Sequence, residues 1–223
     1  MVLYSQPIAP LKRGEQREEL LLRILGRGGE VIAPSEFLPA AERYGMITEI
    51  DRWVLAESVQ LAAGGRRVHV NVSAESVGEA DFLPLVQELL QRTRADPSHL
   101  VFEITETAVM RDLNQAANFA RCVTRLGCRL ALDDFGTGFG SLTYLKRLPI
   151  HYLKIDKEFV AGLVSSPTNQ HLVKAILNLA QGFGQETIAE GVEDDATLEL
   201  LRSYGVDFAQ GFHIGRPACL PTV

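Results

Sequence analysis

Two adjacent aspartates, Asp133 and Asp134, interrupt the segment Arg129–Gly138, which otherwise runs from an apolar strand into a Gly-Thr-Gly turn. Glycines are typical of turns that need a permissive backbone. Neighbouring carboxylates repel each other, so the pair is favourable only on a solvated surface or around a cation. The pair alone could also cap the following turn. At the end of an apolar strand a cation explains it better, and we predict a divalent-metal site centred here.

Other predicted strands carry a polar residue at the corresponding level, close to the strand end. In chain order these residues are Glu19, Asn71, Glu103, Lys154, Glu190 and Gln210. Each has a simpler interpretation when taken alone: Glu19 or Glu103 as an exposed acid, Asn71 as a turn or cap residue, Lys154 as an interior salt-bridge partner. Barrel interiors favour branched apolar side chains, and isolated buried charges are costly. The presence of so many polar residues at the same height in the barrel therefore indicates a compensating cation.

Oxygen ligands without Cys, and with no His at the aligned positions, favour Mg²⁺ or Mn²⁺ over zinc. Glu19, Asn71, Glu103 and Asp133 could complete the shell of one ion, with the aspartate pair leading to a second. Two ions about 4 Å apart clamp the attacking and leaving oxygens of an in-line displacement at phosphorus. The residues alone therefore predict metal-assisted phosphodiester hydrolysis, and they leave the substrate open.

Two further residues complete this predicted chemistry. Lys154 would hold the attacking water or neutralise charge on the phosphoryl oxygens. Glu190 would accept the proton or bind the second ion.

These residues require elements that bring strand ends together. Helical and strand-like segments alternate along the chain, and a short gap after the first strand predicts an antiparallel first pair. The predicted strands are Val2–Ile8, Glu19–Leu25, Val68–Ser73, Leu100–Thr105, the Asp-Asp strand, Tyr152–Asp156, Glu186–Glu190 and Val206–Gly211. The predicted helices are Ser35–Tyr44, Thr48–Ala63, Phe82–Arg92, Asn114–Leu126, Leu142–Lys146, Gln170–Gln181 and Ala196–Ser203. This pattern predicts an α/β fold, a modified (β/α)8 TIM barrel formed by residues 1–223 as a single domain.

Composition restricts the classes of binding partner and the cellular compartment that we expect for this protein. A formal net charge of −6 argues against a DNA or RNA polymer as partner, although a metal can invert the local field for a small phosphorylated ligand. No apolar run is long enough for a membrane span. Cys122, Cys128 and Cys219 lack metal-ligand spacing, which predicts reduced thiols in a cytoplasmic protein.

Seven segments, taken in order, resemble the motif series of EAL domains. They are Glu19–Arg23, Asn71–Ala74, Phe102–Glu106, Asp133–Gly138, Leu153–Asp156, Ala189–Glu193 and Gln210–Phe212. The resemblance covers essentially the whole chain. It implies a modified (β/α)8 barrel that hydrolyses cyclic di-GMP to linear pGpG with two Mg²⁺ or Mn²⁺ ions. It also implies a homodimer, often joined to a diguanylate-cyclase-like or sensor domain, and it allows membrane tethering through parts outside this chain.

The resemblance also assigns roles to individual residues. The implied metal ligands are Glu19, Asn71, Glu103, Asp133, Asp134 and Glu190. Lys154, Glu190 and Gln210 correspond to catalytic positions: a water-contacting lysine, a base and a late active-site glutamine. The implied substrate contacts are Arg23 for a phosphate and Gln6 and Asp51 for the nucleotide. Glu106 corresponds to the glutamate that steadies the loop after the aspartate pair, and Glu193 aligns with a further acid of that kind.

The chain departs from the family pattern at three places. Leu20 replaces the signature alanine, with its side chain expected to point away from the metal, and Gly140 replaces a serine in the loop that couples metals to the dimer interface. The peripheral helix that usually precedes the first strand is missing, so we expect Met1 to be a boundary within a longer multidomain protein. A receptor that binds cyclic di-GMP without cleaving it, and a dimerising regulatory module, are the alternatives to an enzyme. No predicted metal ligand is lost, which favours the enzyme.

Overall fold

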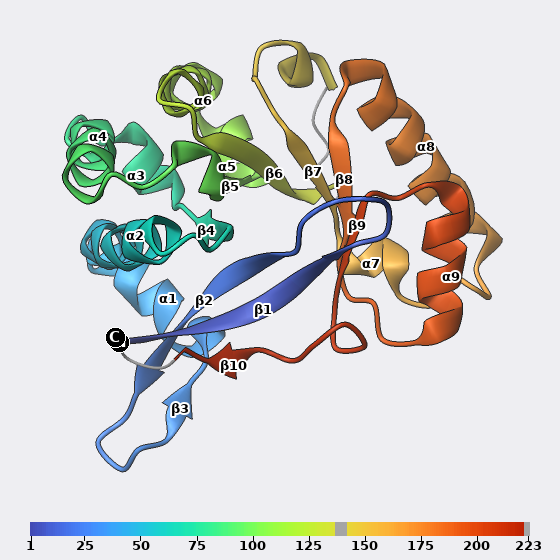
Figure 1. Ribbon diagram of the computed structural model, residues 1–223, viewed down its shortest axis with the longest axis horizontal. Coiled ribbons are helices and arrows are strands. Elements are labelled where there is room, and N and C mark those ends of the chain that lie inside the picture. The colour runs from blue at the N-terminus through green and yellow to red at the C-terminus, as the bar shows by residue number, and fades with distance from the viewer. Residues whose placement is uncertain (137–141, 221–223) are drawn as a thin grey trace.

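The computed structural model describes residues 1–136 and 142–220, and its centre is a closed barrel of eight strands (Figure 1). The barrel strands are β1 (Val2–Pro10), β2 (Arg17–Leu25), β4 (Val68–Asn71), β5 (Leu100–Thr105), β6 (Arg129–Phe135), β7 (Tyr152–Ile155), β8 (Glu186–Ala189) and β9 (Phe208–Gln210). Around the barrel they run in the order β1-β9-β8-β7-β6-β5-β4-β2, and pairing of β1 with β2 closes the ring. The predicted α/β barrel is confirmed.

Strand β1 is antiparallel to both of its barrel neighbours, β2 and β9, whereas the other barrel pairs are parallel. The predicted antiparallel first pair is thus also confirmed. The register places Gln6 opposite Glu19 on β2 and Ile8 opposite Gln210 on β9. Gln6 and Gln210, which are 204 positions apart in the sequence, therefore become neighbours at this seam.

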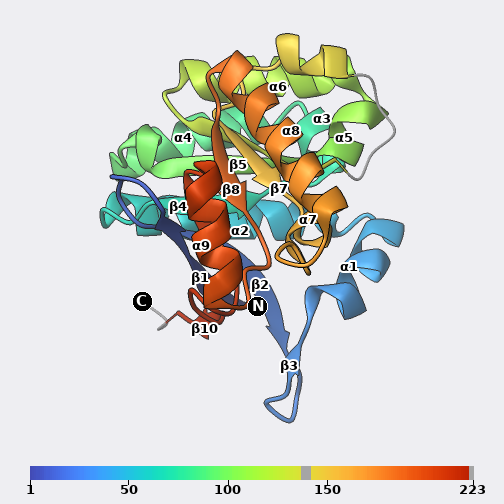
Figure 2. The same cartoon turned by 90° about the vertical axis from the view of Figure 1, so that its right-hand side faces the viewer.

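The helices lie outside the barrel (Figures 1 and 2). They are α1 (Pro34–Arg43), α2 (Ile47–Ala63), α3 (Ala74–Gly78), α4 (Phe82–Thr93), α5 (Glu106–Arg111), α6 (Leu113–Arg125), α7 (Lys157–Val160), α8 (Pro167–Phe183) and α9 (Asp195–Tyr204). Two 3₁₀ turns span Pro97–His99 and Leu142–Lys146. The predicted helices are present, but Leu142–Lys146 is a 3₁₀ turn, and α3, α5 and α7 were not predicted.

Some predicted strands extend beyond the observed ones, and local capping explains one of these differences. The strand predicted to reach Ser73 stops at Asn71, because Ser73 is the N-cap of α3 and its side chain accepts a hydrogen bond from the Ser76 backbone N–H. Glu190 follows β8 instead of ending it, although its backbone N–H still donates to the carbonyl of Ile155. Its side chain keeps the position that the next inward residue of β8 would have.

Alternation along the strands divides the apolar residues into two layers. Outward residues such as Leu130, Leu132 and Leu153 pack beneath the helices in the main core. The lower barrel interior is filled by a second cluster: Ile8, Val101, Ala131, Tyr152, Ile188 and Phe208. On β5, β6 and β7 the residues two positions beyond this inner cluster are Glu103, Asp133 and Lys154. One step further along the same face, the barrel interior therefore changes from apolar to charged.

Two short strands extend the sheet beyond the barrel. β3 (Val31–Ile32) pairs with the end of β2, and β10 (Ala218–Cys219) pairs with β1. Both views show the β2–β3 hairpin projecting away from the barrel (Figures 1 and 2). Within the described ranges, none of the helices has both the length and the apolar character needed to cross a membrane.

Candidate metal centre

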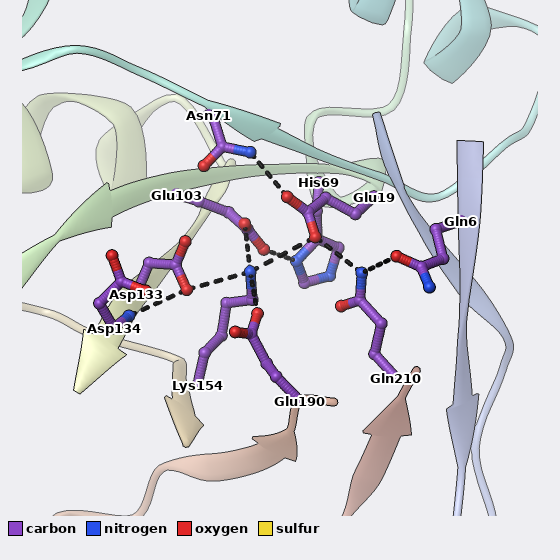
Figure 3. Close-up of polar contacts among 10 residues, drawn as sticks. All are labelled: Gln6, Glu19, His69, Asn71, Glu103, Asp133, Asp134, Lys154, Glu190 and Gln210. Carbon is purple, nitrogen blue, oxygen red and sulfur yellow. Dashed lines mark hydrogen bonds and ion pairs between the residues drawn. The ribbon is translucent and has the colours of Figure 1, made fainter. Parts of the chain in front are cut away.

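Lys154 is buried on β7 and is surrounded by carboxylates from four other segments (Figure 3). Its Nζ lies 2.6 Å from Glu190 Oε1 and 2.7 Å from Glu103 Oε2. Asp133 Oδ1 and Glu19 Oε2 follow at 3.1 and 3.5 Å. Burial acts to lower the pKa of Lys154, but the surrounding carboxylates outweigh it and hold the pKa well above its usual range. The lysine is therefore a permanent cation at the centre of the cluster.

Glu19 is held in place by amide side chains at the seam closed by β1 (Figure 3). Asn71 Nδ2 donates to Glu19 Oε1 and Gln210 Nε2 to Glu19 Oε2, both at 2.7 Å. Gln210 Nε2 also lies 3.2 Å from Gln6 Oε1, and Gln6 donates to the carbonyl of Gly215 at 3.0 Å. Burial acts to raise the pKa of Glu19, yet Lys154 and these donors lower it overall. Glu19 is thus fixed in its ionised form.

The aspartate pair leaves regular strand geometry at the end of β6. The pairing of β6 with β7 shifts register between Leu132 and Phe135. Asp134 has a φ of 53°, a left-handed backbone that non-glycine residues adopt rarely. This turn brings carboxylate oxygens of Asp133, Asp134 and Glu190 within 4.8 Å of one another. Three side chains, two from β6 and one from directly after β8, can therefore share one ion.

Burial without enough positive charge perturbs three acids of the cluster. It raises the pKa of Glu103 well above its usual range, although Lys154 opposes the shift. It raises the pKa of Glu190 to about 8, with Lys154 opposing the shift and Asp133 adding to it. It also raises the pKa of Asp134 to about 6, helped by Asp133 and Asp156. Like charges this close to each other favour the protonated form. A divalent cation would remove this penalty.

The donor set fits a hard divalent metal. In the described part of the chain the cluster presents five carboxylates around one lysine, together with the amide oxygen of Asn71. Oxygen donors of this kind are the ligands of Mg²⁺, Mn²⁺ and Ca²⁺. The predicted metal and catalytic positions meet at one mouth: Glu19, Asn71, Glu103, Asp133, Asp134, Lys154, Glu190 and Gln210. A buried acidic cluster that could bind a metal is therefore present.

His69 is a member of the site that the sequence analysis missed. It is fully buried on β4, one inward position before Asn71, and its Nδ1 lies 2.6 Å from Glu103 Oε1 (Figure 3). Its ring packs against Tyr152 with centroids 5.5 Å apart. Burial, together with Lys154 and Arg17, keeps the pKa of His69 well below its usual value. The shared face of His69 and Asn71 on one strand was the available signal.

The predicted substrate contacts lie at different places. Gln6 lines a cavity of about 400 Å³ at the mouth, together with Glu19, Lys154 and other cluster residues. Asp51 lines a separate, more apolar cavity of about 500 Å³ that also includes Asn71, and accepts a hydrogen bond from the Ser73 backbone N–H at 3.0 Å. Arg23 lies four residues beyond Glu19 on β2, where its guanidinium contacts the carbonyl of Leu22 and the ring of Tyr4.

The remaining predicted residues surround the cluster. Buried Glu106 accepts a hydrogen bond from the Gly136 backbone N–H at 3.1 Å, directly after the aspartate pair. Glu193 lines the mouth cavity. Leu20 points into the main core under the helices, as the alternation on β2 requires. Gly140, and the Thr137-Gly138 part of the predicted turn, lie outside the described residues.

Comparison with known proteins gives consistent matches. The family model described as EAL domain matches residues 1–217. The chain is 36% identical over 221 residues to cyclic di-GMP phosphodiesterase PdeF of Escherichia coli (strain K12), covering 96% of this chain and 30% of PdeF. It is 37% identical to the bifunctional diguanylate cyclase/cyclic di-GMP phosphodiesterase MucR of Pseudomonas aeruginosa, covering 97% of this chain and 33% of MucR. The chain thus spans about a third of the length of these relatives.

A solved structure of the PaMucR phosphodiesterase in complex with c-di-GMP has the same fold. It superimposes with a TM-score of 0.91 at 37% sequence identity, and the match covers 97% of this chain and 91% of that one. The similarity therefore includes the whole barrel and the mouth at which the polar residues meet.

Proposed function

This chain belongs to the EAL domain family, and we propose that it is a metal-dependent phosphodiesterase that hydrolyses cyclic di-GMP to linear pGpG. The observation that carries the proposal is the ring of carboxylates around Lys154 at one mouth of the barrel. A site with this much buried negative charge attracts a cation, and bound cations attract phosphates. The relatives PdeF and MucR, named as cyclic di-GMP phosphodiesterases, support the choice of substrate.

The proposed cofactor is a pair of Mg²⁺ or Mn²⁺ ions. Glu19, Asn71, Glu103 and Asp133 would hold the first ion; Asp133, Asp134 and Glu190 would hold the second. When bound, such ions polarise the phosphoryl oxygens and lower the pKa of the attacking water. The proximity of Asp133, Asp134 and Glu190 supports the second position.

The protein's own residues then perform the remaining steps. Lys154 Nζ faces the carboxylates from inside the barrel, where it neutralises charge and orients the attacking water. Glu190 would accept the proton of that water, which is the proposed alternative to its role as a ligand of the second ion. A new bond forms from the water oxygen to phosphorus, the bond to the ribose 3′ oxygen breaks, and the leaving 3′ oxygen takes up a proton. The product is a linear dinucleotide with a 5′ phosphate.

The two cavities give the substrate a path across the mouth. The polar cavity lined by Gln6, Glu19 and Lys154 suits the phosphates once metal is bound. The more apolar cavity lined by Asp51 suits a purine base, because a carboxylate can accept hydrogen bonds from the N–H groups of guanine. Arg23 lies four residues beyond Glu19 on the same face of β2, and it is the residue proposed to bind a phosphate.

The wider assembly is also part of the proposal. We place this chain as one EAL domain of a longer protein, because its curated relatives are about three times longer and MucR is named as both cyclase and phosphodiesterase. A homodimer and a diguanylate-cyclase-like or sensor domain are the proposed partners. A cytoplasmic location is supported by the three free cysteines, Cys122, Cys128 and Cys219.

Incubation with cyclic di-GMP and Mn²⁺ or Mg²⁺, followed by chromatography of the products, tests the proposal. We expect pGpG from the wild type, none from Glu19→Ala, and slow turnover with Ca²⁺, which prefers longer bonds and more ligands. Binding without cleavage would identify a receptor instead. Neither binding nor cleavage would leave the regulatory module as the function. Equal rates with Ca²⁺ and Mg²⁺ would contradict a tight pair of metal sites.

A further inference from the structure

We propose that His69 is a positioning residue, whose Nδ1–H holds the Glu103 carboxylate in the orientation needed to bind metal. The inference rests on the proposed function, because it takes Glu103 as a metal ligand. It goes beyond that function by adding a buried residue from the layer beneath the carboxylates. His69 would not touch substrate or metal, and its effect would pass entirely through Glu103.

Both carboxylate oxygens of Glu103 already have partners inside the barrel (Figure 3). Oε1 lies 2.6 Å from His69 Nδ1, and Oε2 lies 2.7 Å from Lys154 Nζ. The two partners approach from different sides: Lys154 comes from β7, and His69 from β4, next to β5. Two contacts fix the rotation of a carboxylate, whereas Lys154 alone would leave one oxygen free to turn.

The imidazole is itself held with little freedom. His69 is fully buried, and its ring lies against the ring of Tyr152 in the apolar layer of the barrel. Within residues 1–136 and 142–220, its Nε2 is buried without a hydrogen-bond partner. The polar contact that this structure gives the ring is therefore the one with Glu103. A histidine placed only for packing would not need to face a carboxylate at this distance.

The proposed ligand role of Glu103 decides the direction of the hydrogen bond. A carboxylate that binds a metal has no proton to donate, so Glu103 Oε1 can only accept, and the proton of the imidazole belongs on Nδ1. Nε2 is then an acceptor, which is less costly to leave unpaired than a buried N–H.

Metal affinity measured without substrate tests this inference. Mn²⁺ binding is followed by the electron paramagnetic resonance signal of free Mn²⁺ in titrations of the wild type, His69→Leu, His69→Asn and Tyr152→Phe. We expect His69→Leu to weaken Mn²⁺ binding about 10- to 100-fold, the range typical of lost outer contacts to metal ligands. His69→Asn places an amide N–H near the position of Nδ1 and should recover most of the affinity. Tyr152→Phe keeps the packing against His69 and should bind Mn²⁺ like the wild type.

The outcomes separate this inference from the proposed function. If the wild type binds no Mn²⁺, the metal-dependent function fails first. If the wild type binds Mn²⁺ and a folded His69→Leu protein binds it equally well, the positioning role is wrong. Equal losses in His69→Asn and His69→Leu would also overturn it, because the hydrogen bond would then not be the cause. Nitrogen-15 spectra of labelled histidine in the Mg²⁺-loaded wild type give a second readout: protonation at Nδ1 supports the role, and protonation at Nε2 contradicts it.

Discussion

At the scale of single residues, the site is governed by the imbalance between its acids and one buried lysine. Lys154 is the cation shared by Glu19, Glu103, Asp133 and Glu190, all within 3.5 Å of its Nζ. Removing one partner of a buried ion pair leaves the others uncompensated, which costs far more than the loss of a surface pair. The lysine therefore has a structural role besides any role in catalysis.

Replacement of Lys154 by Met should make the stability of the protein depend on metal. Without metal, we expect Lys154→Met to lower the free energy of unfolding by about 3–5 kcal/mol, since the carboxylates then repel each other in a buried site. Mn²⁺ should restore more stability to the variant than to the wild type. Urea denaturation with and without Mn²⁺ measures both effects.

Lys12→Met is the matched control for that experiment. Lys12 makes a single ion pair with Asp207 at 2.6 Å, and its side chain is 55% exposed. The Lys12→Met substitution should lower the free energy of unfolding by no more than about 1 kcal/mol, and Mn²⁺ should not change this difference. A Lys154→Met protein as stable as Lys12→Met in the absence of metal would show that the carboxylates do not depend on the lysine.

The affinity for Mn²⁺ should rise with pH. Burial raises the pKa of Glu190 to about 8 and that of Asp134 to about 6, so both bind protons near or below neutrality when metal is absent. Metal binding needs the ionised forms, so protons compete with the metal and affinity falls as the pH falls. We expect weaker binding at pH 6 than at pH 8, with proton release on binding. Calorimetric titrations in buffers of different ionisation enthalpy would measure the proton release. An affinity for Mn²⁺ that does not depend on pH would contradict competition between protons and the metal.

The residues of the site were largely predictable, because strand alternation places every second side chain on the same face. Once Asp133 was placed at the end of a strand, Glu103 and Lys154 followed from the same rule. His69 was missed although it shares a strand face with Asn71, because a shared face does not say which side chain it contacts. Its distance to Glu103, a contact between two strands, assigns it to the site. The structure shows where the cluster residues lie, whereas their roles, and those of Gln6, Arg23 and Asp51, stay predictions.

At the scale of elements, the chain departs from regular strand geometry where it must aim side chains into the mouth. The left-handed backbone at Asp134 is one such departure, and Gly191, directly after Glu190, is another with a φ of 68°. A Cβ on Gly191 would lie 2.6 Å from the Cβ of Lys157 at the start of α7. A larger residue would therefore displace either α7 or Glu190.

Gly191→Ala should weaken both the fold and the metal site. We expect a loss of at least about 1–2 kcal/mol from the left-handed backbone alone, and weaker Mn²⁺ binding because Glu190 moves. Gly182→Ala is the matched control: it lies in α8, where a Cβ meets nothing within 4 Å. That change should stabilise the protein by about 0.5–1 kcal/mol. Equal stability and Mn²⁺ affinity in the two variants would contradict the role assigned to Gly191.

Long periodic elements were predictable, and short elements set by capping were not. Helices such as α2 and α8 show a repeating apolar face, which the sequence reveals directly. The single turns α3, α5 and α7 are too short for periodicity. Their N-caps, Ser73, Thr105 and Asp156, lie at or just beyond the end of a barrel strand, and each accepts a hydrogen bond from a backbone N–H. Ser73 and Asp156 are equally compatible with a strand end, which explains why the strands predicted to reach them were too long, whereas Thr105 does end β5.

At the scale of the whole molecule, the geometry of the site depends on closure of the barrel by an antiparallel strand. β1 joins β2 to β9 and so brings Gln6, Glu19 and Gln210 together from opposite ends of the sequence. The alternation of strands and helices predicted the barrel. The short first connection predicted the direction of β1. Which side chains meet across the closed seam depends on the register of β1 against both neighbours, which the sequence pattern does not specify.

The most direct test of the account is anomalous X-ray diffraction from crystals soaked in Mn²⁺. We expect two Mn²⁺ peaks in the mouth of the barrel, one among Glu19, Asn71, Glu103 and Asp133, and one between Asp134 and Glu190 that shares Asp133. Crystals that hold Mn²⁺ elsewhere, or show no peak at these carboxylates although the protein in solution still cleaves cyclic di-GMP, would contradict it.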